Sequence, residues 1–247
     1  RDSYNTLDYT NPKIGPALEN GGGSSRLNSR TFSWTWNNIA SYDKTIGDHH
    51  FNVLAGMEAY SYRYDELTAS RTKMAQPDMP ELVVGSQLTG GSGYRIDYAL
   101  VGYLTQALYD YQNKYFFSAS FRRDGSSRFH PDHRWGTFWS VGASWKIMQE
   151  EFMKDTSDWL SNLSLRASYG AQGNDQVGYY AYQALYSIRN NLGESGLHAY
   201  RLATPNLSWE TNLNTNIGLD FGFWNNRLSG TIEYFERRSK DLLFSKD

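Results

Sequence analysis

Apolar and polar residues alternate strictly along the middle of the chain. Between residues 134 and 147 the odd positions include Trp135, Trp139 and Trp145, whereas the even positions are mostly small or polar. The same alternation returns between residues 163 and 171. A side-chain period of two is typical of a β-strand. These stretches exceed the roughly 5–6 residues of an ordinary globular strand and suit the roughly 9–11 residues of a tilted strand that crosses a membrane.

The same pattern predicts a chain built almost entirely of β-strands. A helical turn or two is expected only between residues 150 and 154. The absence of convincing helices argues against alternating strand–helix architecture. Eight strands are expected in succession, at residues 29–40, 51–59, 94–110, 115–122, 134–147, 163–171, 209–223 and 228–237.

The expected connections alternate between long irregular loops and short turns. This alternation is typical of a transmembrane antiparallel up-and-down β-barrel, in which long loops lie outside the cell and short turns face the periplasm. The loops containing Gly21, Pro77, Asp124 and Tyr180 are therefore assigned to the outside. The turns at Thr45, Asn113, Asp155 and Asn226 are assigned to the periplasm.

A soluble β-sandwich would also alternate, because one face of each of its sheets covers a core. Two features favour the barrel. The non-apolar face carries Ser, Gly, Asn and Thr with few Lys or Glu, and aromatic residues gather at strand ends, as in interfacial girdles. The two interpretations differ in where they place four side chains: a barrel exposes them to lipid, whereas a sandwich buries them between sheets. These four are Trp139, Val141, Leu165 and Leu219.

Composition adds limits to this picture. Hydrophobic residues make up 39% of the chain and aromatic residues 16%, and the formal net charge is −2. The chain therefore has no basic stripe, and nucleic-acid binding is not expected. The absence of cysteine fits an envelope protein but is weak evidence. Because the sequence begins at Arg1 without an initiator methionine, we expect a piece of a longer protein.

Candidate catalytic and metal-binding chemistry is sparse. The segment His130-Pro131-Asp132-His133 offers too few ligands at a recognisable spacing for a metal site. The acidic pairs Asp65-Glu66 and Glu150-Glu151 are adjacent in sequence, so solvated loop charges are favoured over an acid/base couple. No enzyme activity, cofactor or metal ion is expected.

Several sequence blocks, taken together, match a known family. They include Arg122-Arg123-Asp124-Gly125-Ser126-Ser127-Arg128-Phe129 and Arg134-Trp135-Gly136. Leu165-Arg166-Ala167-Ser168-Tyr169-Gly170, Leu207-Ser208-Trp209-Glu210 and Asn216-Ile217-Gly218-Leu219-Asp220 follow them. In this combination the chain resembles the SusC-like (SusC/RagA) TonB-dependent outer-membrane transporters of Bacteroidota.

The resemblance implies a function and a set of partners. Family members have a barrel of ~22 strands with a plugged lumen, and residues 1–247 would be a partial barrel domain without the plug and the remaining strands. The resemblance implies import of glycan oligomers or peptides, a SusD-like surface lipoprotein as a lid, and energy from the TonB complex acting on the plug. Outer-membrane lipid surrounds such a barrel, and two transporter–lid pairs can form a dimer.

Two groups of residues could contact substrate or lid. One is the charged group Arg122, Arg123, Asp124 and Arg128, for which a structural clasp between loop and strand ends is the favoured alternative. The other is the tyrosine-rich loop, for which self-packing is an equal alternative. Its tyrosines combine a flat apolar ring with a hydroxyl, which suits stacking on sugars or packing on a protein. They are Tyr179, Tyr180, Tyr182 and Tyr186.

Two other functional classes stay open from the sequence. A passive porin or an adhesin barrel shares the alternation but not the Arg-Arg-Asp-Gly-Ser-Ser-Arg-Phe block. A soluble carbohydrate-binding β-domain would be extracted without detergent. The sequence does not identify the substrate.

Overall fold

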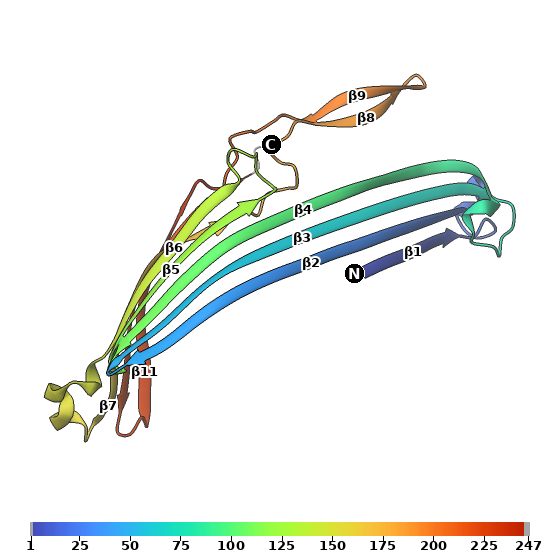
Figure 1. Ribbon diagram of the computed structural model, residues 1–247. Coiled ribbons are helices and arrows are strands. Elements are labelled where there is room, and N and C mark those ends of the chain that lie inside the picture. Colours follow the sequence, from blue (N-terminus) through green and yellow to red (C-terminus); the bar gives the residue numbers. More distant parts are fainter. Residues whose placement is uncertain (1, 245–247) are drawn as a thin grey trace. The chain divides into compact units, whose positions relative to one another are not determined.

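The computed structural model describes residues 2–244, which form one nine-stranded antiparallel sheet and one separate hairpin (Figure 1). In the sheet the order is β1-β2-β3-β4-β5-β6-β7-β10-β11, so every strand except β7 and β10 neighbours the strands next to it in sequence. The strands of the sheet are β1 (Asp2–Thr10), β2 (Gly23–Ile46), β3 (His49–Met74), β4 (Gly85–Tyr111), β5 (Tyr115–Ser126), β6 (Trp135–Lys146), β7 (Leu160–Asn174), β10 (Glu210–Phe223) and β11 (Leu228–Lys240).

Short helices and a hairpin complete the described chain. The hairpin consists of β8 (Leu185–Asn191) and β9 (Glu194–Arg201), which pair only with each other. The helices are α1 (Ala17–Asn20) and three 3₁₀ helices, η1 (Leu82–Val84), η2 (Ile147–Gln149) and η3 (Glu151–Thr156). None of the helices in residues 2–244 is long and apolar enough to cross a membrane.

All eight expected strands are present, but the predicted count was too low. Eleven strands occur in the described residues, and β1, β8 and β9 lie in segments that the sequence predicted as loops. The long strands β3 and β4 likewise extend into the segment around Pro77 that the sequence predicted as a loop. The error has one cause: these segments carry polar residues on both faces, so no apolar period marks them. Asp124 also lies in β5 and not in a loop, which begins after Ser126.

The chain divides into two compact units, and each of the long strands β2, β3 and β4 has one part in unit 1 and one part in unit 2. Unit 1 comprises residues 1–35 and 60–99. Within it β1 pairs with the first part of β2, from Asp2 opposite Thr31 to Thr10 opposite Gly23. Side chains tie its two loops together, since Asn11 donates a 2.8 Å hydrogen bond to the carbonyl oxygen of Pro77. Unit 1 is therefore held mainly by backbone pairing and polar contacts.

Unit 2 comprises residues 36–59 and 100–247. Figure 1 shows β5 and β6 running side by side within it, and the pairing continues without a break from β4 to β7, then to β10 and β11. The turn between β4 and β5 is tight because Gln112 and Asn113 both adopt a φ of +53°. Such left-handed turns match the twist of the flanking strands.

Each strand of unit 2 presents one apolar face and one polar face, and the register aligns these faces across the sheet. Phe121 lies opposite Trp139, and Trp139 lies opposite Ala171. The apolar face is exposed: Trp139 is 39%, Val141 48% and Leu165 40% accessible. Leu219, which lies opposite Leu165, is partly exposed. Because these side chains are not buried between stacked sheets, the β-sandwich interpretation is wrong. An exposed apolar face of this extent requires an apolar surrounding.

The alternation of connections holds only in part within unit 2. The short turn expected at Asp155 is instead a longer connection, residues 147–159, which contains η2 and η3 and exceeds the loop of residues 127–134 in length. The turns at Asn113 and Asn226 lie at one end of the antiparallel strands, and the loops at residues 127–134 and 175–209 lie at the other. The first and last strands of the sheet, β1 and β11, do not pair with each other. The sheet is therefore a section of a barrel wall, not a closed barrel.

Candidate functional site

The polar face of unit 2 carries partly buried charged groups that bind one another. Arg122 on β5 donates through Nε to both carboxylate oxygens of Asp124, at 2.8 Å each. Its terminal nitrogen lies 3.4 Å from the carboxylate of Glu58 on β3. Arg122 and Asp124 are two residues apart on one strand, so they share a face. The three residues link β3 to β5 across the intervening β4.

Two further ionic clusters lie on the same face. Arg166 on β7 reaches Asp220 on β10 at 3.3 Å and Glu233 on β11 at 3.7 Å, and so connects three strands. The imidazole of His50 lies between two carboxylates, 2.7 Å from Asp110 and 3.0 Å from Asp43. The polar face therefore carries both positive and negative side chains, which point to the same side of the sheet.

A hollow of about 600 Å³ lies against this wall between two of the clusters. Its lining combines His50 and Arg166 with the ring of Phe116 and several small residues, among them Ser118, Gly142, Ser144 and Ser168. Small side chains leave room beside the wall there, and His50 and Arg166 border the hollow while bound to their carboxylate partners. This is a surface on which a polar segment or solute can rest.

The charged block of residues 122–129 ends in a clasp that joins two loops of unit 2. The hydroxyl of Ser126 donates a 2.8 Å hydrogen bond to the carboxylate of Asp175, and Ser126 is fully buried. Arg128 donates to the main-chain carbonyl of Asp175 at 2.9 Å, and its guanidinium lies 4.9 Å from the ring centre of Tyr179. Arg128 is thus engaged in holding the loop that follows β7.

An aromatic core supports this clasp. Phe129 is completely buried, and its ring lies 5.4 Å from that of Trp209, which in turn lies 5.2 Å from Phe138. Trp209 donates from its indole nitrogen to the carbonyl of Arg134 at 2.8 Å. Gly173 leaves room for Phe138, since a Cβ there would lie only 2.1 Å from the phenyl ring. Three chain segments distant in sequence, at residues 129–138, Gly173 and Trp209, are therefore packed together.

The four candidate arginine and aspartate residues do not form a single site. Arg122 and Asp124 face the polar side, and Arg128 binds the clasp. Arg123 has the parity of the apolar face, and its guanidinium lies 5.6 Å from the ring centre of Trp135. The observed contacts fit the clasp that the sequence analysis favoured, and a role in contacting substrate or lid stays a prediction.

The candidate tyrosines are likewise dispersed. Tyr182 lies edge-on to His130 at 5.7 Å, and its hydroxyl accepts a hydrogen bond from Gln183. Tyr180 adopts a φ of +57°, and its carbonyl oxygen accepts from Arg201 at 3.0 Å. Tyr186 stands apart on β8 and is 62% exposed. The structure brings Tyr179 to Arg128 and Tyr182 to His130 but does not gather the four tyrosines into one cleft.

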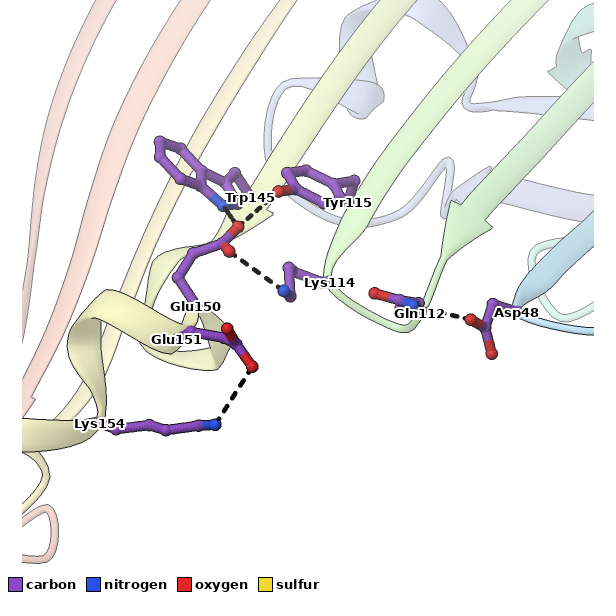
Figure 2. A network of polar contacts seen from close by, with 8 residues as sticks. All are labelled: Asp48, Gln112, Lys114, Tyr115, Trp145, Glu150, Glu151 and Lys154. Atoms are coloured by element: carbon purple, nitrogen blue, oxygen red, sulfur yellow. Dashed lines mark hydrogen bonds and ion pairs between the residues drawn. The ribbon is translucent and has the colours of Figure 1, made fainter.

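The connection between β6 and β7 is fixed by one carboxylate at the end with the short turns. Figure 2 shows Glu150 accepting hydrogen bonds from the hydroxyl of Tyr115 at 2.5 Å, from the indole of Trp145 at 2.9 Å and from Lys114 at 3.1 Å. These donors lower the pKa of Glu150, the Tyr115 hydroxyl contributing most. By contrast, Glu151 meets only Lys154, at 3.4 Å.

Several of these contacts were missed by the sequence analysis. Glu58, Arg166 and Asp220 fall on the polar positions of alternating strands, so parity could have placed them on the same face as Arg122. Nothing in the sequence signalled Asp175, because its partners Ser126 and Arg128 are almost fifty residues away. Within residues 2–244 no group of three metal-ligating side chains is present.

Comparisons with known proteins give these features a context. The model of the family "TonB dependent receptor-like, beta-barrel" matches residues 1–247. The chain is 33% identical over 222 residues to the TonB-dependent receptor SusC of Bacteroides thetaiotaomicron, which covers 87% of this chain. It is 31% identical over 248 residues to the TonB-dependent receptor P39 of Formosa agariphila, which covers 97% of this chain.

Solved structures give the same result. The RagAB peptide transporter superposes with a TM-score of 0.84 at 31% identity, over 90% of this chain. The "open-open" state of the RagAB peptide importer gives a TM-score of 0.80 at 30% identity. The chain spans 22% of the length of SusC, 23% of P39 and 25% of the RagAB chain, and so corresponds to about a quarter of these relatives.

Proposed function

The chain belongs to the TonB-dependent receptor-like β-barrel family and is SusC-like, and from this premise we propose that the intact protein is an energised importer in the outer membrane. Its substrates would be glycan oligomers or peptides. The single observation that carries the proposal is the two-faced wall: an exposed apolar face and a charged polar face on the same strands. Members of this family are transporters and receptors, and no enzyme activity is proposed.

The two faces of such a wall would contact different surroundings. The apolar face would lie against hydrocarbon, which supports a multi-pass barrel in the outer membrane. The polar face would line the lumen, where Arg122 and Arg166 with their carboxylate partners would meet the plug and passing solute. Residues 1–247 would then form one part of the barrel domain, and the plug and the other strands of a ~22-stranded barrel would be supplied by the rest of the protein.

The proposed partners follow from the relatives. A SusD-like surface lipoprotein would cover the mouth of the barrel, and the TonB complex would act through the plug. The RagAB relatives transport peptides, which supports a peptide as one of the two substrate classes. The loops that follow β5 and β7, which the clasp joins, would form part of the surface that meets the lid. A dimer of transporter–lid pairs is proposed on the same basis.

Uptake by the intact protein tests this proposal. Cells that produce it with its neighbouring lipoprotein would be given fluorescent oligosaccharides or peptides, with and without a functional TonB. We expect accumulation of one class that depends on TonB and on the lipoprotein. Accumulation that persists without TonB would support the passive porin instead, and extraction of the protein without detergent would support the soluble carbohydrate-binding domain.

The tyrosine-rich loop is tested in the same system. The double variant Tyr180→Ala/Tyr182→Ala in the intact transporter should reduce ligand capture or lid binding, because both side chains lie in the loop that the clasp holds. A matched control is Tyr42→Ala, an exposed tyrosine on β2. If the double variant binds both ligand and lid as the control does, the loop has no role in recognition.

A further inference from the structure

The apolar face of β11 changes character at a defined position. The side chains on this face are Leu228, Ile232 and Tyr234, which are 54%, 65% and 58% exposed, followed by Glu236, Arg238 and Lys240. Four strand positions of the same parity, from Leu228 to Tyr234, are free of charge, and the next three all carry charge. A membrane-spanning strand needs roughly 9–11 residues. The charged positions therefore begin where the hydrocarbon of the outer leaflet ends.

The outward face of β5, a second strand of the same wall, also changes from apolar to charged. On β5 the apolar face carries Tyr115, Phe117, Ala119 and Phe121, and then Arg123. Eight residues separate Tyr115 from Arg123, as eight separate Leu228 from Glu236. The two strands both start from a short turn and run in the same direction in the sheet. On both strands the charged residues of the outward face thus follow the apolar positions and are not scattered among them.

The cations of β11 border a hollow on this outward face. It has a volume of about 380 Å³ and is lined by Tyr169 of β7, by Leu213 and Thr215 of β10, and by Glu236, Arg238 and Lys240. The register brings these side chains together, since Arg238 lies opposite Leu213 and Glu236 lies opposite Thr215. The floor is apolar or small, one wall is aromatic, and the upper rim is cationic.

The geometry of Arg238 leaves it able to bind a further anion. Its Nε donates to the carboxylate of Glu236 at 2.6 Å, and the side chain is 72% exposed. That bond uses one of the five N–H donors of a guanidinium, and the terminal nitrogens form a fork that fits a phosphate. The two cations outnumber the single carboxylate, so the rim carries a net positive charge.

We propose that this hollow binds the phosphate-bearing headgroup of an outer-leaflet lipid, with Arg238 and Lys240 on the phosphate and an acyl chain beside Leu213 and Tyr169. The occupant is a lipid because the hollow is continuous with the lipid-facing belt. A soluble anion would gain nothing from the apolar floor, whereas a lipid uses both parts of the site. The inference rests on the proposed placement in the outer membrane.

Native mass spectrometry of the detergent-purified intact transporter tests the site. The probe is bis-phosphorylated lipid A, compared with lipid A from which both phosphates have been removed. We expect the wild-type protein to retain the phosphorylated lipid at least about tenfold better than Arg238→Gln/Lys240→Gln, because each cation at an anionic lipid surface contributes severalfold to binding. The dephosphorylated lipid should not distinguish the two proteins.

A matched control removes two cations near the short turns. Lys44→Gln/Arg227→Gln changes the net charge by the same amount at two other exposed positions and should leave lipid retention within about twofold of wild type. An equal loss of lipid retention in both double variants would overturn the site in favour of general electrostatic attraction. Equal retention of phosphorylated and dephosphorylated lipid by the wild-type protein would also overturn it. Membrane fractionation of the wild-type protein is a separate readout: absence from the outer membrane overturns the proposed function, whereas presence there without lipid retention overturns only this site.

Discussion

The strand β3 shows in one continuous segment how the two units differ. In its unit 2 part, the odd positions from 51 to 59 are Phe51, Val53, Ala55, Met57 and Ala59. In its unit 1 part, the odd positions Arg63 and Asp65 are charged, and each binds a partner on β4: Arg63 meets Asp97 at 2.7 Å and Asp65 meets Arg95 at 2.6 Å. One strand with one backbone geometry therefore carries two different outer surfaces.

The difference shows which medium each part meets. The apolar positions extend over roughly the 9–11 residues that a tilted strand needs to cross a bilayer. The charged pairs that follow are about half exposed, and exposed pairs of this kind add little stability in water but would be costly in hydrocarbon. In the proposed outer-membrane location, the boundary between lipid and water on β3 would therefore lie between Ala59 and Arg63.

The ends of the strands differ in packing as well. In unit 2 the loops after β5 and β7 enclose Phe129, which is completely buried. Among the described residues of unit 1, the buried apolar side chains are Ala17 and Met74. Unit 2 thus has an aromatic core at its loop end, whereas the loops of unit 1 depend on polar contacts such as Asn11 to Pro77. Four predictions test these differences.

The largest effect is expected from removing the core of the clasp. Phe129→Ala should lower the free energy of local opening by about 3–5 kcal/mol, because a buried phenyl ring is lost and a cavity remains. Hydrogen exchange of residues 127–138 in the intact protein measures it. Phe152→Ala, at a 66% exposed phenylalanine on η3, should change the free energy of local opening by less than about 0.5 kcal/mol. Similar changes in this free energy for the two variants would show that burial of Phe129 does not stabilise the clasp.

The lipid boundary is tested by placing a charge on either side of it. Val141→Arg, in the middle of the apolar face of β6, should cost about 2–4 kcal/mol of barrel stability, because the guanidinium must enter hydrocarbon. Leu67→Arg, at an exposed odd position in the unit 1 part of β3, should cost less than about 0.5 kcal/mol. Denaturant titration of the intact protein in lipid vesicles measures both. Equal costs would place the two positions in the same medium.

The sequence predicted the part of the molecule that a bilayer organises and missed the part that it does not. The strands around Trp139 and Leu165 were found because hydrocarbon demands an apolar residue at every second position. The strand β1 was missed because Asp2–Thr10 meets no such demand, and only pairing with β2 makes it a strand. The same reasoning applies to the site. The alternating pattern could assign Arg166 to the polar face, whereas the hydrogen bond from Ser126 to Asp175 depends on the packing of two loops that are distant in sequence.

Carboxylates in the two units should also respond differently to neutralisation. Asp124→Asn removes a side chain that is 10% exposed and bound by Arg122, so a loss of about 1.5–3 kcal/mol is expected. Asp97→Asn removes a partner of Arg63 that is 49% exposed, so a loss of about 0–1 kcal/mol is expected. Vesicle unfolding titrations compare the two. A larger loss of stability for Asp97→Asn than for Asp124→Asn would show that the partly buried pair of Arg122 and Asp124 is not the stronger of the two.

The smallest effect concerns pH at the connection between β6 and β7. The hydrogen bonds from Tyr115, Trp145 and Lys114 lower the folded-state pKa of Glu150, so its contribution to stability is present at neutral pH. That contribution should begin to fall as the pH drops below the ordinary pKa of a glutamate and should be lost once the pH passes the lowered value. Hydrogen exchange of residues 147–159 should therefore accelerate on acidification in the wild-type protein. Glu150→Gln should already exchange faster at neutral pH and respond less to acid, whereas Glu151→Gln, which removes only the exposed pair with Lys154, should keep the wild-type profile. If Glu151→Gln abolished the response and Glu150→Gln did not, the carboxylate with three donors would not be the group that fixes this connection.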